Sequence, residues 1–185
     1  KGDSANTKRI SLHNHSGTHI DFPNHFLENG KSSSDYAADF WIFNDPYVIK
    51  ISPCDDEIIL LDKSMIETIP KETDFLILNT GFYKHRGTKK FWNNNPGISP
   101  DLAELLKLRC PNLKVLGMDT ISLTSYQNRM LGRDSHRKFL GENNILLVED
   151  MNLKDLISAP VKLMCFPILI EEVDGCPVTI ISEHE

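Results

Sequence analysis

Residues 15–25 read His-Ser-Gly-Thr-His-Ile-Asp-Phe-Pro-Asn-His and place three imidazoles and one carboxylate within eleven positions. Histidine is concentrated in this part of the chain, because four of its seven histidines lie between residues 13 and 25. Neutral imidazole and carboxylate together are typical ligands of zinc, manganese and iron. The stretch therefore predicts a metal site, and the hypothesis it suggests is a metal-dependent hydrolase.

The spacing of these side chains requires a turn in the backbone. In a straight strand His15, His19 and Asp21 would share one face, but His15 and Asp21 would stand about 20 Å apart at roughly 3.3 Å per residue. A zinc–ligand bond is only about 2 Å long, so a straight strand cannot present both to one ion. Gly17 and Pro23 are the residues that permit a turn. We therefore expect a curved loop or short helical turn whose ligands point inward.

A set of solvated histidines is the alternative interpretation of this stretch. For any single histidine that alternative is the better one, and it applies to His13, which lies outside the spacing and is expected to be exposed. His85 and His184 carry little information on their own. The alternative is much weaker for the imidazoles and the carboxylate of residues 15–21 taken together.

Length and charge bound the class of protein. A chain of 185 residues fits one domain, residues 1–185, with a core of its own. Its formal charge of -6 argues against nucleic acid as a partner, since phosphate binding needs clustered lysine and arginine. The four cysteines form no C-x-x-C pair, and we expect no disulfide framework. No apolar segment approaches the roughly 20 residues of a membrane helix and no signal stretch opens the chain, so we expect a cytoplasmic protein without a membrane partner.

Short apolar runs alternate with helix signals along the chain. Several runs are continuous, as in strands that are covered on both faces. Ser99-Pro100-Asp101 is typical of a helix start, a second helix is expected from Asp134 to Gly141, and a third over residues 63–69. Strands that alternate with helices indicate an α/β protein. The expected strands are Tyr47–Ile51, Glu57–Leu61, Phe75–Leu78, Lys114–Met118, Ile145–Val148, Lys162–Ile170 and Val178–Ile181.

Two carboxylates directly follow predicted strands. Glu149 follows the run Ile145–Val148, and Asp119 follows the run that ends at Met118. Open α/β sheets bind ligands beyond the carboxyl ends of their strands. Either acid alone could be a surface residue where a strand meets water, but together with the histidine stretch they indicate a common site.

The string from His15 to His25 resembles the signature of the cyclase family, which includes bacterial kynurenine formamidases (arylformamidases) and isatin hydrolase, all of them metal-dependent hydrolases. Further blocks resemble the middle and the end of the family pattern in the same order, so the resemblance covers most of the chain. It implies a mixed sheet flanked by helices, of the swivelling β/α/β type. The blocks are Asn79–Phe82, Gly87-Thr88, Asn95–Pro100, Asp119–Ser122, His136, Ile145–Glu149, Cys165–Ile168 and Asp174–Val178.

The resemblance implies a site with two divalent metals per subunit, zinc first and manganese as the second choice. The first metal would be held near the start of the chain, and a bridging carboxylate would connect it to the second. The implied metal ligands are His15, His19 and Asp21, then Asp21 again with His136 and Glu149; His25 would transfer protons, and Asp119, Ser122 and Phe82 would lie behind the ligands or in the substrate pocket.

Two features depart from the family pattern. His136 and Glu149 are thirteen residues apart, about one more than the resemblance implies, which predicts an insertion within Glu142-Asn143-Asn144. The chain begins with Lys-Gly-Asp-Ser rather than Met, and we expect the family's N-terminal strand, which supplies pocket residues, to be missing from it.

The implied substrate is an aryl formamide such as N-formylkynurenine, hydrolysed to kynurenine and formate by a homodimer or homotetramer. One alternative is a related enzyme that opens a cyclic amide or lactone, as isatin hydrolase does. A second is a non-catalytic protein that binds a small molecule through its metal, although such a protein would have no need of His25. A third, a Ser-His-Asp hydrolase, is disfavoured because the chain lacks a Gly-x-Ser-x-Gly motif.

Overall fold

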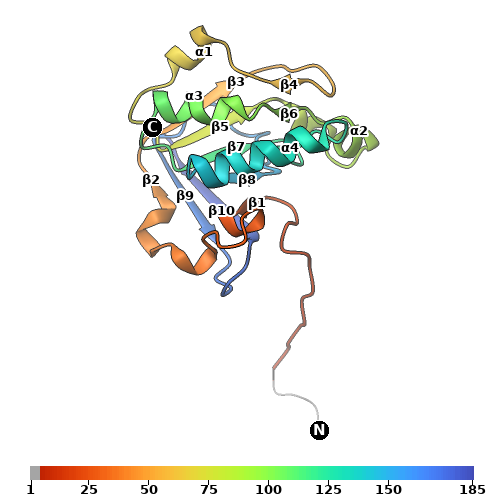
Figure 1. The fold of residues 1–185 in the computed structure, drawn as a ribbon. Helices are drawn as coiled ribbons and strands as arrows, with labels where there is room; N and C mark the ends of the chain where they lie inside the picture. Colours follow the sequence, from red (N-terminus) through yellow and green to blue (C-terminus); the bar gives the residue numbers. More distant parts are fainter. Residues whose placement is uncertain (1–4) are drawn as a thin grey trace.

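A computed structural model describes residues 5–185 of the chain. An eight-stranded mixed sheet organises it, with the strand order β2-β9-β10-β1-β8-β7-β5-β3. This arrangement, with helices beside the sheet, confirms the predicted α/β class and mixed sheet (Figure 1). The strands are β1 (His19–Asp21), β2 (Ile42–Phe43), β3 (Pro46–Lys50), β5 (Phe75–Asn79), β7 (Val115–Met118), β8 (Leu146–Glu149), β9 (Lys162–Pro167) and β10 (Gly175–Glu183), beside a small parallel pair of β4 (Ile58–Ile59) and β6 (Gly97–Ile98).

The parallel half of the sheet contains β3, β5, β7 and β8. Residues 75–78 and all of β7 and β8 are buried, as expected for continuous apolar runs that are covered on both faces. Helices α3 (Asp101–Arg109) and α4 (Arg129–His136) lie over one face of this half (Figure 1). Leu102 and Leu106 of α3 are fully buried in the core that results.

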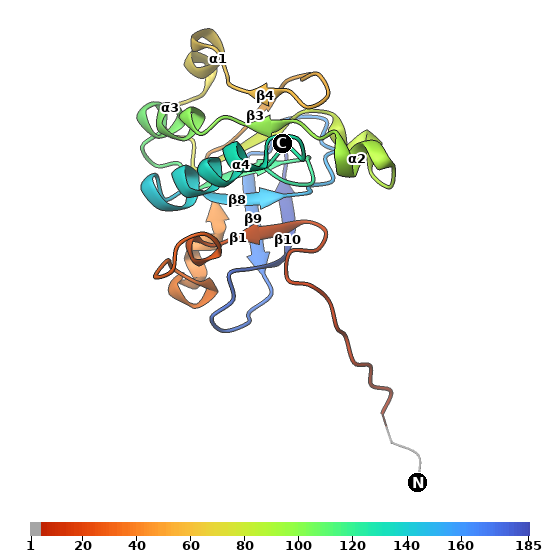
Figure 2. The same cartoon turned by 45° about the vertical axis from the view of Figure 1, so that its right-hand side comes forward.

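The antiparallel half contains β2, β9, β10 and β1. Strand β1 lies between β10 and β8 and is antiparallel to both, so it joins the two halves of the sheet. Strands β9 and β10 run across the direction of β8, which is clearest in Figure 2. Residues 5–12 are exposed and extend away from the folded body in both views.

The histidine stretch differs in part from the expected loop. His19–Asp21 is a strand, and a 3₁₀ turn over Pro23–His25 follows it. The predicted turn lies before the strand, at Gly17, whose φ of +66° suits glycine. The strand is only three residues long, so His15 approaches it by way of this turn.

The helices are close to the expected segments, with one wrong boundary. The helix expected from Asp134 begins at Arg129. The earlier start was missed because the buried residues of α4 are Gly132, Ser135 and His136, which form no apolar stripe in the sequence. The other helices are α1 (Lys63–Thr68) and α2 (Lys89–Asn93), with short 3₁₀ segments at Pro23–His25, Ser33–Asp35, Ala38–Trp41 and Phe82–His85.

A π-helix, Arg137–Glu142, continues α4. A π-helical turn holds more residues than an α-helical turn. The π-helix therefore accommodates an additional residue between His136 and Glu149. It ends at Glu142, the first residue of the segment where an insertion was predicted. Within residues 5–185, no helix is both long and apolar enough to cross a membrane.

Gly117 is a close-packed position in the middle of β7. A Cβ atom there would lie 2.6 Å from Met151 Sδ and 2.8 Å from a ring carbon of Phe75, which is fully buried. We expect Gly117→Ala to lower the free energy of unfolding by about 1–3 kcal/mol, the usual effect of overpacking a core. Urea denaturation measures the change.

Gly141→Ala is the matched control. Its Cβ would meet the methyl end of the flexible Leu27 side chain, and alanine favours the helical backbone. A Gly117→Ala variant as stable as Gly141→Ala would contradict the packing described for β7.

Candidate metal centre and active site

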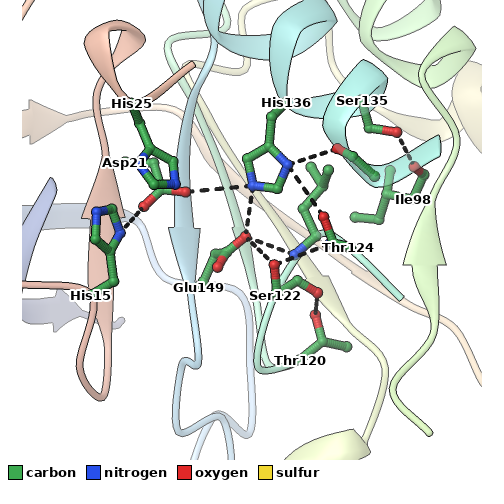
Figure 3. A network of polar contacts seen from close by, with 12 residues as sticks. His15, Asp21, His25, Ile98, Thr120, Ser122, Thr124, Ser135, His136 and Glu149 are labelled. Carbon is green, nitrogen blue, oxygen red and sulfur yellow. Dashed lines mark hydrogen bonds and ion pairs between the residues drawn. The ribbon is translucent and has the colours of Figure 1, made fainter. Parts of the chain in front are cut away.

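Strand β1 carries two predicted ligands to the edge of the parallel half. His19 and Asp21 alternate along β1 and so share a face, and His19 lies opposite Glu149 in the β1–β8 pair. Glu149 is the last residue of β8, at the carboxyl edge where α/β sheets bind ligands. His136, the last residue of α4, points to the same place (Figure 3). The structure thus brings together side chains from three distant segments.

Within residues 5–185 the possible ligand atoms form three groups, and two of them share Asp21. These two, the donor groups, are His15, His19 and Asp21, and Asp21, His136 and Glu149; the third is His15, His25 and Asp174. Within each group the ligand atoms lie within 4.8 Å of one another. All members of the donor groups except His15 are buried. Asp21 is thus shared by two sets of imidazole and carboxylate donors; the bridged pair of metals that the resemblance implies stays a prediction.

Four of the imidazole–carboxylate distances at these groups are longer than direct hydrogen bonds and fit a cation better, whereas His15 Nδ1 lies 2.9 Å from Asp21 Oδ1, at hydrogen-bond distance. His19 Nε2 lies 3.4 Å from Asp21 Oδ1 and 3.5 Å from Glu149 Oε2. His136 Nε2 lies 3.6 Å from Asp21 Oδ2 and 3.4 Å from Glu149 Oε1. Good N–H···O bonds are about 2.7–3.2 Å long, whereas two ligands of a tetrahedral zinc with bonds of about 2 Å stand roughly 3.3 Å apart.

Backbone carbonyls fix the orientation of two histidines. His19 Nδ1 lies 2.8 Å from the carbonyl oxygen of Gly17, and His136 Nδ1 lies 2.7 Å from that of Gly132. A carbonyl only accepts, so each Nδ1 carries the proton and donates it. Once Nε2 gives up its proton on metal binding, each ring would direct the Nε2 lone pair toward the site, with the carbonyl acting like the outer hydrogen bonds that orient metal-ligating histidines.

The metal-free site holds charge on its imidazoles. Burial lowers the pKa of His15 and His136, but the hydrogen bonds and charge of neighbouring carboxylates outweigh it and raise their pKa values to about 9 and about 10. Asp21 acts on both of them, Asp174 on His15 and Glu149 on His136. Burial also opposes ionisation of Asp21, yet the same imidazoles hold its pKa well below the usual range. A metal must therefore displace protons when it binds.

The loop after β7 holds Glu149 in place. Ser122 Oγ and Leu123 N both donate to Glu149 Oε1, at 3.1 and 2.7 Å. Asn95 holds this loop in turn: its Nδ2 donates to the carbonyl oxygens of Ser122 and Thr124 at 3.3 and 2.8 Å, and the residue is 1% exposed. Ser122 therefore lies behind Glu149, one of the predicted ligands, and Asn95, which the sequence reasoning included in a block but gave no role, supports the same loop.

Asp174 is a further residue that the sequence reasoning missed. Its Oδ2 accepts a hydrogen bond from His25 Nδ1 at 2.7 Å and lies 3.1 Å from His15 Nε2. His25 Nδ1 therefore carries the proton, and its Nε2 is left as an acceptor. The sequence feature that could have identified Asp174 is the Asp174-Gly175 pair, which opens the last block that resembles the family. Gly175 leaves room for His15, because a Cβ at this position would overlap the imidazole ring.

Two predicted residues lie away from the ligands. Asp119 is fully buried and accepts hydrogen bonds from Thr80 N, Thr80 Oγ1 and Tyr83 N at 2.8, 2.8 and 3.2 Å, so it anchors the loop after β5. Phe82 is buried against Phe91. Neither is among the residues that line the pocket at the donor groups.

A pocket of about 490 Å³ opens over the donor groups. The five predicted ligands and His25 line it, together with apolar side chains of Phe26, Trp92 and Ile121. The ring of Phe26 stacks on His136 with centroids 4.4 Å apart. The pocket therefore combines a polar floor with apolar walls, as small-molecule sites do.

The chain is similar to known proteins in both sequence and fold. The family model described as Putative cyclase matches residues 3–125. Cyclase-like protein 3 of Arabidopsis thaliana is 28% identical over 186 residues, which cover 97% of this chain and 66% of the plant protein. A kynurenine formamidase of Bacillus thuringiensis subsp. konkukian is 26% identical over 177 residues, covering 95% of this chain and 78% of the enzyme.

The fold is also similar to that of isatin hydrolase A from Labrenzia aggregata. The TM-score is 0.75 at 22% identity, over 95% of this chain and 76% of the other. The family model spans residues 3–125, about two thirds of the chain, and includes the first donor group and the loop that supports Glu149. The chain therefore belongs to the Putative cyclase family.

Proposed function

We propose that this protein is a metal-dependent hydrolase of amide bonds, and that its substrate is an aryl formamide such as N-formylkynurenine. The observation that carries the proposal is the buried Asp21, shared by two donor groups, with His25 facing the same pocket. The kynurenine formamidases among its relatives support the choice of bond.

Divalent cations held by the two donor groups would supply Lewis-acid chemistry, since they lower the pKa of a water molecule and polarise a carbonyl oxygen. The protein's own contribution is a fixed set of donors. His19 and His136 are oriented by backbone carbonyls, and Glu149 is held by the loop after β7. Such support keeps ligands in place without reorganisation during the reaction.

His25 is the group that moves the proton. Its Nε2 would take a proton from the water whose oxygen attacks the formyl carbon. The carbon–nitrogen bond then breaks, and the same proton passes from His25 to the leaving nitrogen, giving an arylamine and formic acid, which releases the second proton of the water to solvent and becomes formate. Asp174 holds the ring in the tautomer that this transfer requires and stabilises its charged form.

The second candidate function is ring opening of a cyclic amide, because the same donor groups and His25 could catalyse that hydrolysis. The third candidate is a protein that binds its ligand without catalysis. Zinc as the metal, manganese as its substitute, two ions per subunit, the cytoplasmic location and a homo-oligomeric state stay predictions.

Activity of the metal-loaded protein tests the proposal. We expect hydrolysis of N-formylkynurenine, followed by the absorbance of kynurenine, to be faster than opening of isatin. His25→Ala should lower kcat by about 10²–10⁴-fold, the usual contribution of a general base, with metal content unchanged in elemental analysis.

His13→Ala is the matched control, because His13 is exposed and outside the pocket. Full turnover by His25→Ala would remove His25 from the mechanism. Faster opening of isatin would select the second candidate, and turnover of neither substrate would favour a binding protein.

Asp21 is predicted to be the ligand on which both ions depend. Asp21→Ala removes a donor from each group, so we expect it to lose both ions, whereas His15→Ala affects only the first. Elemental analysis of dialysed protein, with circular dichroism to check folding, gives the ion count. Two ions retained by Asp21→Ala would refute the bridging role.

Metal affinity should rise with pH. The raised pKa values of about 9 for His15 and about 10 for His136 leave both imidazoles protonated at pH 7, and protons must leave before a metal binds. Because the folded pKa values exceed the usual 6.5, the imidazole–carboxylate contacts stabilise the metal-free protein fully below about pH 6.5. That stability falls as pH rises toward 9 and 10.

Calorimetric titration with zinc at pH 6, 7 and 8, in buffers of different ionisation enthalpy, counts the protons released. Thermal unfolding of the metal-free protein over pH 6–10 gives the matching stability curve. Zinc binding without proton release at pH 7 would contradict the charged state assigned to His15 and His136.

A further inference from the structure

A second cavity, of about 300 Å³, adjoins the pocket over the donor groups. The two share the side chains of Phe26, Trp92, Ile121, Ser122 and Thr124 as lining residues. The second cavity extends toward the N-terminal end of α4, where α2 also lies (Figure 1). A molecule whose reacting group lies over the donors can therefore extend into this second space.

The far part of this second cavity is cationic. Arg129 and Arg133 line it, and none of its lining residues is a carboxylate. Within the described residues 5–185, neither arginine has an ion-pair partner. Two unpaired guanidinium groups at one end of a cavity are notable in a chain with a formal charge of -6.

Helix geometry relates these arginines to the metal ligand His136. At 3.6 residues per turn, positions 129, 133 and 136 fall within about 60° of arc on one face of α4. The rise of about 1.5 Å per residue places Arg133 about 4.5 Å and Arg129 about 10.5 Å from His136 along the helix axis. Helix α4 thus carries the proposed metal ligand His136 and two cationic side chains on one face. Arg133 lies about one turn from His136, and Arg129 lies about two turns from it.

Apolar and aromatic side chains lie between the donors and the arginines. Phe26 stacks on His136, and Trp92 and Tyr126 line the second cavity while 57% and 47% exposed. The Arg129 guanidinium lies over the Tyr126 ring, 4.4 Å from its centroid. This contact holds the guanidinium by cation–π attraction and leaves its edge free to donate hydrogen bonds.

From this order of donor groups, aromatic side chains and arginines along the two cavities, we propose that Arg129 and Arg133 form a subsite for a carboxylate of the substrate. The substrate class is then an amide with the scissile bond over the donor groups, an aromatic ring against Phe26 and Trp92, and a carboxylate beyond the ring. This inference rests on the proposed function and narrows it. An uncharged cyclic amide such as isatin gains nothing from the two arginines.

Paired ligands that differ only in the carboxylate test the subsite. Calorimetry of the metal-loaded protein compares kynurenine with its methyl ester, and kinetics compare N-formylkynurenine with its methyl ester. We expect the wild type to prefer each acid by about tenfold, the low end for charge-assisted hydrogen bonds, because both arginines are exposed.

In the double variant Arg129→Ala/Arg133→Ala, this preference should fall to near unity. For the formyl substrate the loss should lie in KM, with kcat unchanged within about twofold, since a remote carboxylate contact is made equally in the ground and transition states. Arg137→Ala is the matched control: it is on the same helical segment but exposed and paired with Asp134, and it should keep the preference.

Equal affinity of the wild type for acid and ester, binding of neither, or a preference that survives in the double variant would overturn the subsite. A wild type that prefers kynurenine through these arginines but hydrolyses no formamide would leave the subsite standing and refute the proposed function instead. The binding and kinetic measurements therefore separate the two failures.

Discussion

The buried carboxylate of Asp21 is the group on which the site depends. It is 1% exposed and lies near the imidazoles of His15, His19 and His136. A buried charge without partners is very costly, so these imidazoles, or a cation held together with Asp21, stabilise the fold as well as the proposed site. The same contacts therefore serve stability and the proposed chemistry.

Strand β1 makes this arrangement possible although it has only three residues. It is antiparallel to β8 on one side and to β10 on the other. The β8 side positions His19 opposite Glu149, and the β10 side places Gly175 and Asp174 beside His15 and His25. A single short strand therefore brings together both donor groups that share Asp21 and the hydrogen-bonded pair His25–Asp174, in which His25 is the proposed proton-transfer residue.

Much of this could be predicted from the sequence. Continuous apolar runs identified β5, β7 and β8. These strands are buried on both faces, so their runs show no alternation of apolar and polar residues. The clustering of His15, His19 and Asp21, and the position of Glu149 after a strand, indicated a common site because ligand chemistry restricts residue type so strongly. Convergence of these segments, by contrast, depends on strand order, which no local pattern contains.

The remaining differences have local physical causes. Helix α4 begins five residues before the expected start. The prediction missed those residues because the helix buries glycine, serine and histidine, which form no apolar stripe in the sequence. Asp119 resembled a site residue because it follows a strand, but the backbone and side chain of Thr80 satisfy one of its carboxylate oxygens. Asp174 was missed because its partners lie about 150 residues away in the chain.

The buried amide of Asn95 has a consequence for the durability of the protein. Conversion of this amide to an acid would set a negative charge against two carbonyl oxygens of the loop that holds Glu149. Spontaneous deamidation proceeds by attack of the following backbone nitrogen on the side chain, and here that residue is Pro96, whose ring nitrogen carries no hydrogen. The position of Pro96 thus protects the Asn95 side chain, and with it the loop that holds Glu149, from this route of deamidation.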